Sequence, residues 1–111
     1  PADCAQFVLV GSSMGAYVAA AVSAHEAPQG LFLLAPAVYL PGYPTESLAP
    51  RAGQSLVIHG WGDETVPVDN VIRWCREQRL PLLLLDGDHR LMTVLDTLCE
   101  RFGHFLDGLG D

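Results

Sequence analysis

The sequence predicts an α/β fold in which a mostly parallel sheet carries helices on both faces, giving three α/β/α layers. Four short apolar runs end at Gly, Pro or Asp-Gly, a pattern typical of parallel strands buried on both faces. Stretches with helical periodicity lie between and after these runs. The 111 residues, half of them hydrophobic, suit a single domain, and we expect residues 1–111 to form one.

The four predicted strands are 7–10, 31–35, 56–59 and 82–85. The first would stand at an edge of the sheet, where its backbone N–H and C=O groups lack partners on one side. We therefore expect the Phe7–Val10 edge to pair with a second copy of the chain, as a homodimer, or with a preceding segment.

Three helices are predicted, over 14–24, 69–79 and 91–109. The first is Ala-rich and nearly apolar all round, so it should pack tightly on the sheet. The second opens with Asp69 as an acidic N-cap candidate, and the third has Leu and Phe spaced by three or four residues. Residues 36–53, rich in Pro and Gly, form the one long irregular segment.

The charge and composition exclude several classes of function. The net charge is −7 and all six basic residues are Arg, so nucleic acids and anionic membrane surfaces are poor partners. The longest apolar run, Leu82–Leu85, is far shorter than the ~18 residues of a membrane span. Three cysteines without metal-ligand spacing predict a reduced, cytoplasmic protein, and no metal or cofactor is expected.

A G-x-S-x-G motif, residues 11–15, lies where the first strand turns into the first helix. In so sharp a turn, side chains two positions before and after Ser13 would collide, which explains Gly11 and Gly15. Ser13 would stand clear of the sheet, and the Met14 N–H at the helix start could bind an oxyanion. The alternative is a Gly-rich turn in which Ser13 caps the helix.

An acid and a histidine follow the third and fourth strands. Asp63 is preferred to Glu64 because a Gly-rich turn leads into it, and His89 precedes the last helix. His59, which closes the third strand, is expected to pack or to orient the segment around Asp63. Alone, Asp63 is more often a turn former and His89 a surface residue. Parallel strands end at one edge, so Ser13, Asp63 and His89 should meet there as nucleophile, orienting carboxylate and general base.

The sequence resembles the α/β-hydrolase superfamily, in which the catalytic residues follow the order Ser, Asp, His. The resemblance covers nearly the whole chain but only the carboxyl-terminal part of that fold, so the N-terminal strands are expected to be absent. It implies a small serine hydrolase, or esterase, with little lid. It also implies weak activity from this chain alone, because the family's second oxyanion donor comes from an earlier loop. The resemblance rests on Gly11-Ser12-Ser13-Met14-Gly15, on His59-Gly60-Trp61-Gly62-Asp63 with Val66-Pro67, and on Asp88-His89.

The expected substrate is a small carboxylic ester, with thioesters and amides as variants of the same acyl-enzyme chemistry. Because 36–53 is too short for a helical cap domain, the site should be open and shallow. Tyr39 and Trp61 are as well explained as packing aromatics. The residues expected to line an apolar substrate pocket are Ala37, Tyr39, Leu40, Trp61 and Val66.

Two alternatives stay open at this level. The chain could be a non-catalytic binding or interaction scaffold, or a fragment that acts only with a partner segment. Residues 11–15 could also be a phosphate-binding turn, although a G-x-G-x-x-G pattern and Lys are both lacking. Covalent labelling of Ser13 would separate the hydrolase from both alternatives.

Overall fold

The computed structural model describes residues 7–44 and 48–109, and the described strands form one parallel sheet in the order β1-β2-β3-β4. This confirms the predicted α/β fold class. The elements, in chain order, are β1 (Val8–Ser12), α1 (Met14–Glu26), β2 (Gly30–Leu34), β3 (Gln54–Gly60), α2 (Val68–Gln78), β4 (Leu82–Leu85), a short 3₁₀ helix (Met92–Val94) and α3 (Leu95–Leu109).

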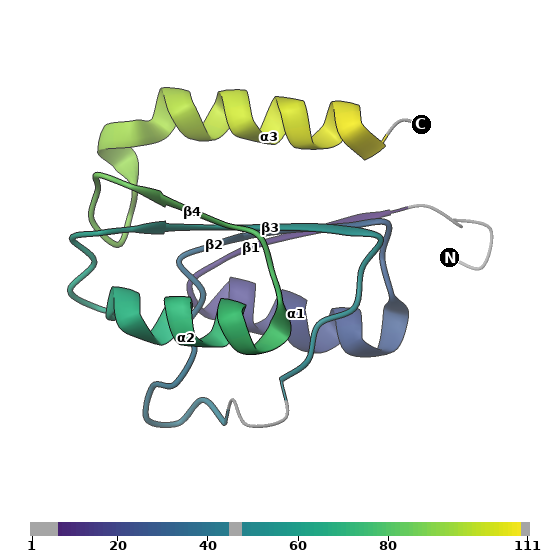
Figure 1. Ribbon diagram of the computed structural model, residues 1–111, viewed down its shortest axis with the longest axis horizontal. Helices are drawn as coiled ribbons and strands as arrows, with labels where there is room; N and C mark the ends of the chain where they lie inside the picture. The colour runs from purple at the N-terminus through teal and green to yellow at the C-terminus, as the bar shows by residue number, and fades with distance from the viewer. Residues whose placement is uncertain (1–6, 45–47, 110–111) are drawn as a thin grey trace.

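Helices cover both faces of the sheet (Figure 1). Helices α1 and α2 lie on one face and α3 on the other. Side chains of β2 alternate between the two, as a pleated strand requires. Leu31 and Leu33 pack in the cluster that contains α1 and α2, whereas Phe32 packs with Phe105 of α3. The predicted three-layer arrangement is therefore present.

Burial on both faces holds for the central strands but not for the outer ones. Strand β2 is almost entirely buried, as is the second half of β3. The four leucines of β4 are only partly buried, and Val10 of β1 is 54% exposed. The prediction of full burial was wrong for β1 and β4 because each has a strand on one side only within the described sheet.

The helices differ from prediction mainly at their ends and on their outer faces. Helix α1 buries Ala16, Ala19 and Ala20 against the sheet but leaves Val18 and Val22 exposed, so only one of its faces packs. Helix α2 begins at Val68, which places Asp69 in its first turn and not at the N-cap, where Pro67 lies. None of the helices in the described ranges combines the length and apolar character that a membrane span needs.

Residues 36–44 and 48–53, the described part of the irregular segment, contain neither helix nor strand. Two side chains of α2 bind the segment, one in each of its described parts. The Asn70 side-chain amide donates to the Val38 carbonyl at 3.1 Å, and the Trp74 indole donates to the Leu48 carbonyl at 3.0 Å. These bonds attach the segment to α2, and the Gly53 N–H donates to the Pro28 carbonyl at 3.0 Å, so the segment runs from the carboxyl end of β2 to the amino end of β3.

Candidate active site

Ser13 lies directly between β1 and α1, in a backbone conformation that non-glycine residues rarely adopt (φ 56°, ψ −117°). A Cβ at Gly11 would lie 2.3 Å from the Gly15 carbonyl oxygen and 2.7 Å from the Ala16 Cα, so Gly11 is required by close approach of the backbone. Beyond the neighbouring backbone of α1, a Cβ at Gly15 would meet no atom of the described residues within 4 Å. The predicted collision therefore holds for Gly11 and is wrong for Gly15 within the described structure.

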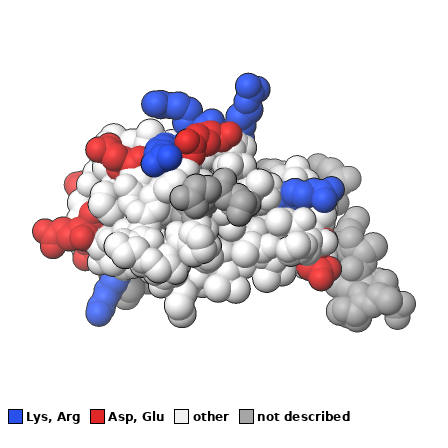
Figure 2. Space-filling model, turned by 90° about the horizontal axis from the view of Figure 1, so that it is seen from below, with Lys and Arg blue, Asp and Glu red and all other residues white. Residues whose placement is uncertain are grey.

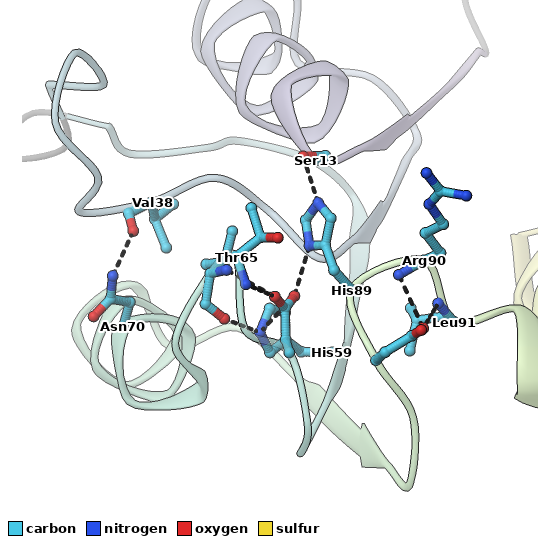
Figure 3. Close-up of polar contacts among 11 residues, drawn as sticks. Ser13, Val38, His59, Thr65, Asn70, His89, Arg90 and Leu91 are labelled. Atoms are coloured by element: carbon cyan, nitrogen blue, oxygen red, sulfur yellow. Dashed lines mark hydrogen bonds and ion pairs between the residues drawn. The ribbon is translucent and has the colours of Figure 1, made fainter.

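Three side chains from three loops form a continuous hydrogen-bonded series (Figure 3). His89 Nδ1 lies 2.7 Å from Asp63 Oδ2, and since a carboxylate only accepts, the imidazole donates this bond. Its Nε2 is then an acceptor, and the Ser13 hydroxyl donates to it at 2.9 Å. The structure thus brings together the three residues that the sequence predicts to meet.

The loops after β3 and β4 are bound to each other, which sets the distance between Asp63 and His89. The Gly62 N–H donates to the Gly87 carbonyl at 2.9 Å. A Cβ at Gly60 would lie 2.3 Å from that same carbonyl oxygen, so the close approach depends on glycine. The glycines of this loop therefore let the two strand ends come together.

Backbone N–H groups hold the buried carboxylate of Asp63. Its Oδ1 accepts from the Thr65 N–H at 2.8 Å and from the Val66 N–H at 2.7 Å, which leaves Oδ2 for His89. The Asp63 side chain is fully buried, whereas the neighbouring Glu64 is exposed. This difference favours Asp63 over Glu64 as the carboxylate that orients the imidazole.

A second imidazole lies against the same carboxylate. His59 is completely buried, and its Nε2 lies 2.8 Å from the Val66 carbonyl oxygen and 3.3 Å from Asp63 Oδ2. Burial lowers the pKa of His59, while the Val66 carbonyl and Asp63 oppose that shift. The sequence indicates only that His59 closes a strand near Asp63, and the contact itself depends on how the following loop folds back.

The residues expected to line a substrate pocket divide into two groups. Ala37 and Val66 are 2% and 0% exposed and belong to the core between the sheet and α1 and α2. Both side chains therefore pack in the core of the described residues, and their place in a substrate pocket stays a prediction. Tyr39 and Leu40, by contrast, help to line a hollow of about 700 Å³ with Arg73.

One further hollow borders the hydrogen-bonded series, and two large apolar side chains on the segments that carry it are exposed. Trp61 is 58% exposed, and Met14, the first residue of α1, is 60% exposed. A shallow hollow of about 220 Å³ borders His89, and its other lining residues are Gly62, Glu64, Thr65, Asp88 and Arg90. Among the described residues, His89 therefore borders a hollow that opens to the outside, and the open site expected from the short 36–53 segment stays a prediction.

The arrangement suits proton transfer away from the serine hydroxyl. His89 can take the Ser13 proton at Nε2 while Asp63 holds the opposite nitrogen and stabilises the resulting cation. Met14 lies at the N-terminus of α1, and the first N–H groups of a helix have no carbonyl partner inside it. Such an N–H group is suited to binding a negatively charged oxygen that develops beside Ser13.

Neither the protein-family models nor the curated proteins compared with the sequence match it. Several solved structures, however, are similar to this chain. A protein from Xanthomonas campestris pv. campestris, described as a hydrolase of the α/β superfamily, is 32% identical with a TM-score of 0.82. The match covers 96% of this chain and 61% of that protein.

Two further solved structures are similar. An α/β serine hydrolase homologue from Coxiella burnetii is 30% identical, with a TM-score of 0.73 over 86% of this chain and 46% of that protein. A lidless α/β serine hydrolase from Xanthomonas campestris is 33% identical, with a TM-score of 0.66 over 76% of this chain and 38% of that protein. The chain thus spans between about two fifths and three fifths of the length of these proteins.

Proposed function

Because this chain has the fold of the α/β-hydrolase superfamily, we propose that it acts as a serine hydrolase on a small carboxylic ester. Ser13 is the nucleophile, His89 the general base and Asp63 the carboxylate that orients the imidazole. The single observation that carries this proposal is the continuous bonding from Ser13 Oγ to His89 and on to Asp63, at 2.9 and 2.7 Å. The similarity to serine hydrolases from Coxiella burnetii and Xanthomonas campestris supports it.

Acylation is the first half of the proposed reaction. Ser13 Oγ attacks the ester carbonyl as its proton passes to His89 Nε2, and the Met14 N–H binds the oxyanion. The tetrahedral intermediate then collapses as the C–O bond to the alcohol breaks. His89 gives its proton to the departing alkoxide, which leaves as the alcohol.

Deacylation repeats these steps with water in place of the serine. His89 takes a proton from water, the resulting hydroxide attacks the acyl carbonyl, and the Ser13 Oγ leaves with the proton returned by His89. A carboxylic acid is released and the free enzyme is restored. Thioesters and amides would follow the same course with a thiol or an amine as the leaving group.

The Met14 N–H is the one oxyanion donor that we propose within this chain. Loss of one donor from an oxyanion hole costs about 10²–10³-fold in kcat. We therefore expect slow hydrolysis of activated esters such as p-nitrophenyl acetate.

The decisive experiment is labelling with a fluorophosphonate, which reacts with activated serines. We expect the wild-type chain to be labelled, Ser13→Ala to be unlabelled, and His89→Ala to be labelled much more slowly. Ser12→Ala is the matched control, since Ser12 is the adjacent, exposed serine and should leave labelling unchanged. If the wild-type chain is not labelled, or if Ser13→Ala is labelled equally, the hydrolase proposal is wrong and a non-catalytic binding scaffold is favoured.

A further inference from the structure

His59 is the one buried histidine among the described residues, and its bonding determines where its proton lies. A carbonyl oxygen can only accept, so the 2.8 Å contact with the Val66 carbonyl requires a hydrogen on Nε2. Nδ1 is buried with no hydrogen-bond partner among the described residues. A proton on Nδ1 would therefore be buried without an acceptor, and the neutral, Nε2-protonated ring is the form that fits.

The His59 ring, Val66 and Asp63 each contact the other two, next to the hydrogen-bonded series of Ser13, His89 and Asp63. Val66 donates its N–H to Asp63 Oδ1 and accepts at its carbonyl from His59, so both of its backbone polar groups are bound. His59 Nε2 also lies 3.3 Å from Asp63 Oδ2, the same oxygen that His89 binds. A shift of the His59 ring would disturb both the turn that holds Oδ1 and the surroundings of Oδ2.

An ordinary core residue would not have these features. An apolar side chain of similar size would fill the space without leaving a buried nitrogen unpartnered, which is an energetic cost. The position instead holds a donor that reaches two groups of the Asp63 loop. The cost of burying the unpartnered Nδ1 is explained if the site requires the hydrogen that the same ring donates from Nε2.

We propose, on the basis of the proposed function, that His59 is a positioning residue for Asp63. Its neutral imidazole holds the Val66 carbonyl and lies against Oδ2, and so keeps the carboxylate directed at Nδ1 of His89. His59 does not contact Ser13, and it takes no proton in the reaction. Its effect reaches the reacting atoms through Asp63 and His89.

The test compares two substitutions of the buried ring. His59→Gln keeps a side-chain N–H donor near the position of Nε2, whereas His59→Leu removes it. Loss of a hydrogen bond in a charged network should lower kcat for p-nitrophenyl acetate roughly 10- to 100-fold in His59→Leu, with KM within about twofold. His59→Gln should recover most of that loss.

A control separates positioning from general destabilisation. Phe105→Ala removes buried volume on α3, where Phe105 lies against Gly30 at the amino end of β2, and should lower the melting temperature while leaving kcat close to wild type. If His59→Leu loses no more activity than Phe105→Ala at comparable stability, or if Gln and Leu are equally impaired, His59 does not position Asp63.

A proton NMR measurement keeps this test independent of the hydrolase proposal. The Nδ1 proton of His89, bound to Asp63, should give a low-field signal in the wild type and in His59→Gln. In His59→Leu that signal should shift or be lost by exchange. An unchanged signal would overturn the positioning role even if Ser13 is labelled, and failure of Ser13 to label would not affect this result.

Discussion

At the scale of single residues, bonding and burial decide which of several candidate groups is suited to catalysis. Asp63 and Glu64 are adjacent in the sequence, yet only Asp63 is buried, held by two backbone N–H groups and bonded to His89. Glu64 is exposed beside the hollow next to His89. Although the two carboxylates have nearly the same chemistry, we expect loss of Asp63 to lower kcat far more than loss of Glu64.

We predict that Asp63→Asn lowers kcat for an activated ester by roughly 10³–10⁴-fold. The amide would present N–H groups where His89 needs an acceptor, so the imidazole would be held in the wrong tautomer. Glu64→Gln is the matched control and should change kcat by less than about twofold. Steady-state kinetics of both variants check the prediction, and equal losses in the two would contradict the assignment of Asp63.

The buried His59 also predicts how stability depends on pH. Burial lowers its pKa below the ordinary 6.5, against the opposing influence of the Val66 carbonyl and Asp63, and the nearby His89 lowers it further. The unfolded chain therefore takes up a proton at this residue before the folded chain does. The resulting loss of stability is absent above pH 6.5 and grows as the pH falls from 6.5 towards the lowered pKa.

We expect the wild-type chain to lose more free energy of unfolding between pH 7.5 and 5.5 than His59→Leu does. Urea denaturation at the two pH values measures this difference. His25→Leu, which also removes one imidazole but from an exposed position on α1, is the matched comparison. Identical losses in wild type and His59→Leu would show that the buried imidazole does not titrate as described.

At the scale of elements, the turn from β1 to α1 depends on one glycine more than on the other. Gly11 lies against the backbone of Gly15 and Ala16, and the approach is too close for any side chain. Gly15 lies in the first turn of α1 with open space where its Cβ would be. A clash with neighbouring backbone therefore explains why a glycine is needed at position 11, but it does not explain the glycine at position 15.

We predict opposite effects for the same substitution at these two positions. Gly11→Ala forces the strand and helix apart and should destabilise the chain by about 1–3 kcal/mol or more. Gly15→Ala should be neutral or stabilise by up to about 1 kcal/mol, since alanine is favoured over glycine within a helix. Thermal denaturation checks both, and a destabilising Gly15→Ala would point to a contact absent from the described residues.

At the scale of the whole molecule, an apolar surface runs along the outer side of β1 and α1. Met14, Val18 and Val22 repeat every four residues on α1 and are 60%, 51% and 39% exposed, and Val10 on β1 is 54% exposed. Figure 2 views the molecule from the side of α1 and α2 and shows broad uncharged areas there. The pairing expected at the Phe7–Val10 edge stays a prediction, and this surface adjoins that edge.

We predict that Val18→Glu combined with Val22→Lys keeps the fold and reduces concentration-dependent association. Both side chains are largely exposed, and the new charges form a favourable i, i+4 pair, so the unfolding free energy should change by less than about 0.5 kcal/mol. Sedimentation velocity over a range of concentrations measures association. Ala19→Glu, on the buried side of α1, is the contrasting variant and should unfold the chain.

The sequence by itself determined the elements, their order and the parallel α/β class. Apolar runs, helical spacing and Gly or Pro stops are local signals, and they place the strands and helices within a few residues. Because parallel strands end at one edge, the same signals predict that Ser13, Asp63 and His89 converge.

Only the tertiary structure decided how each side chain is used. The partial burial of β4, the inward turn of Ala37 and Val66, and the contact between His59 and Asp63 all depend on residues distant in the chain. Such contacts follow from the way loops fold back onto strand ends, and no local pattern encodes them. Sequence therefore predicts which residues meet at the site, whereas the orientation of each group depends on packing across the whole fold.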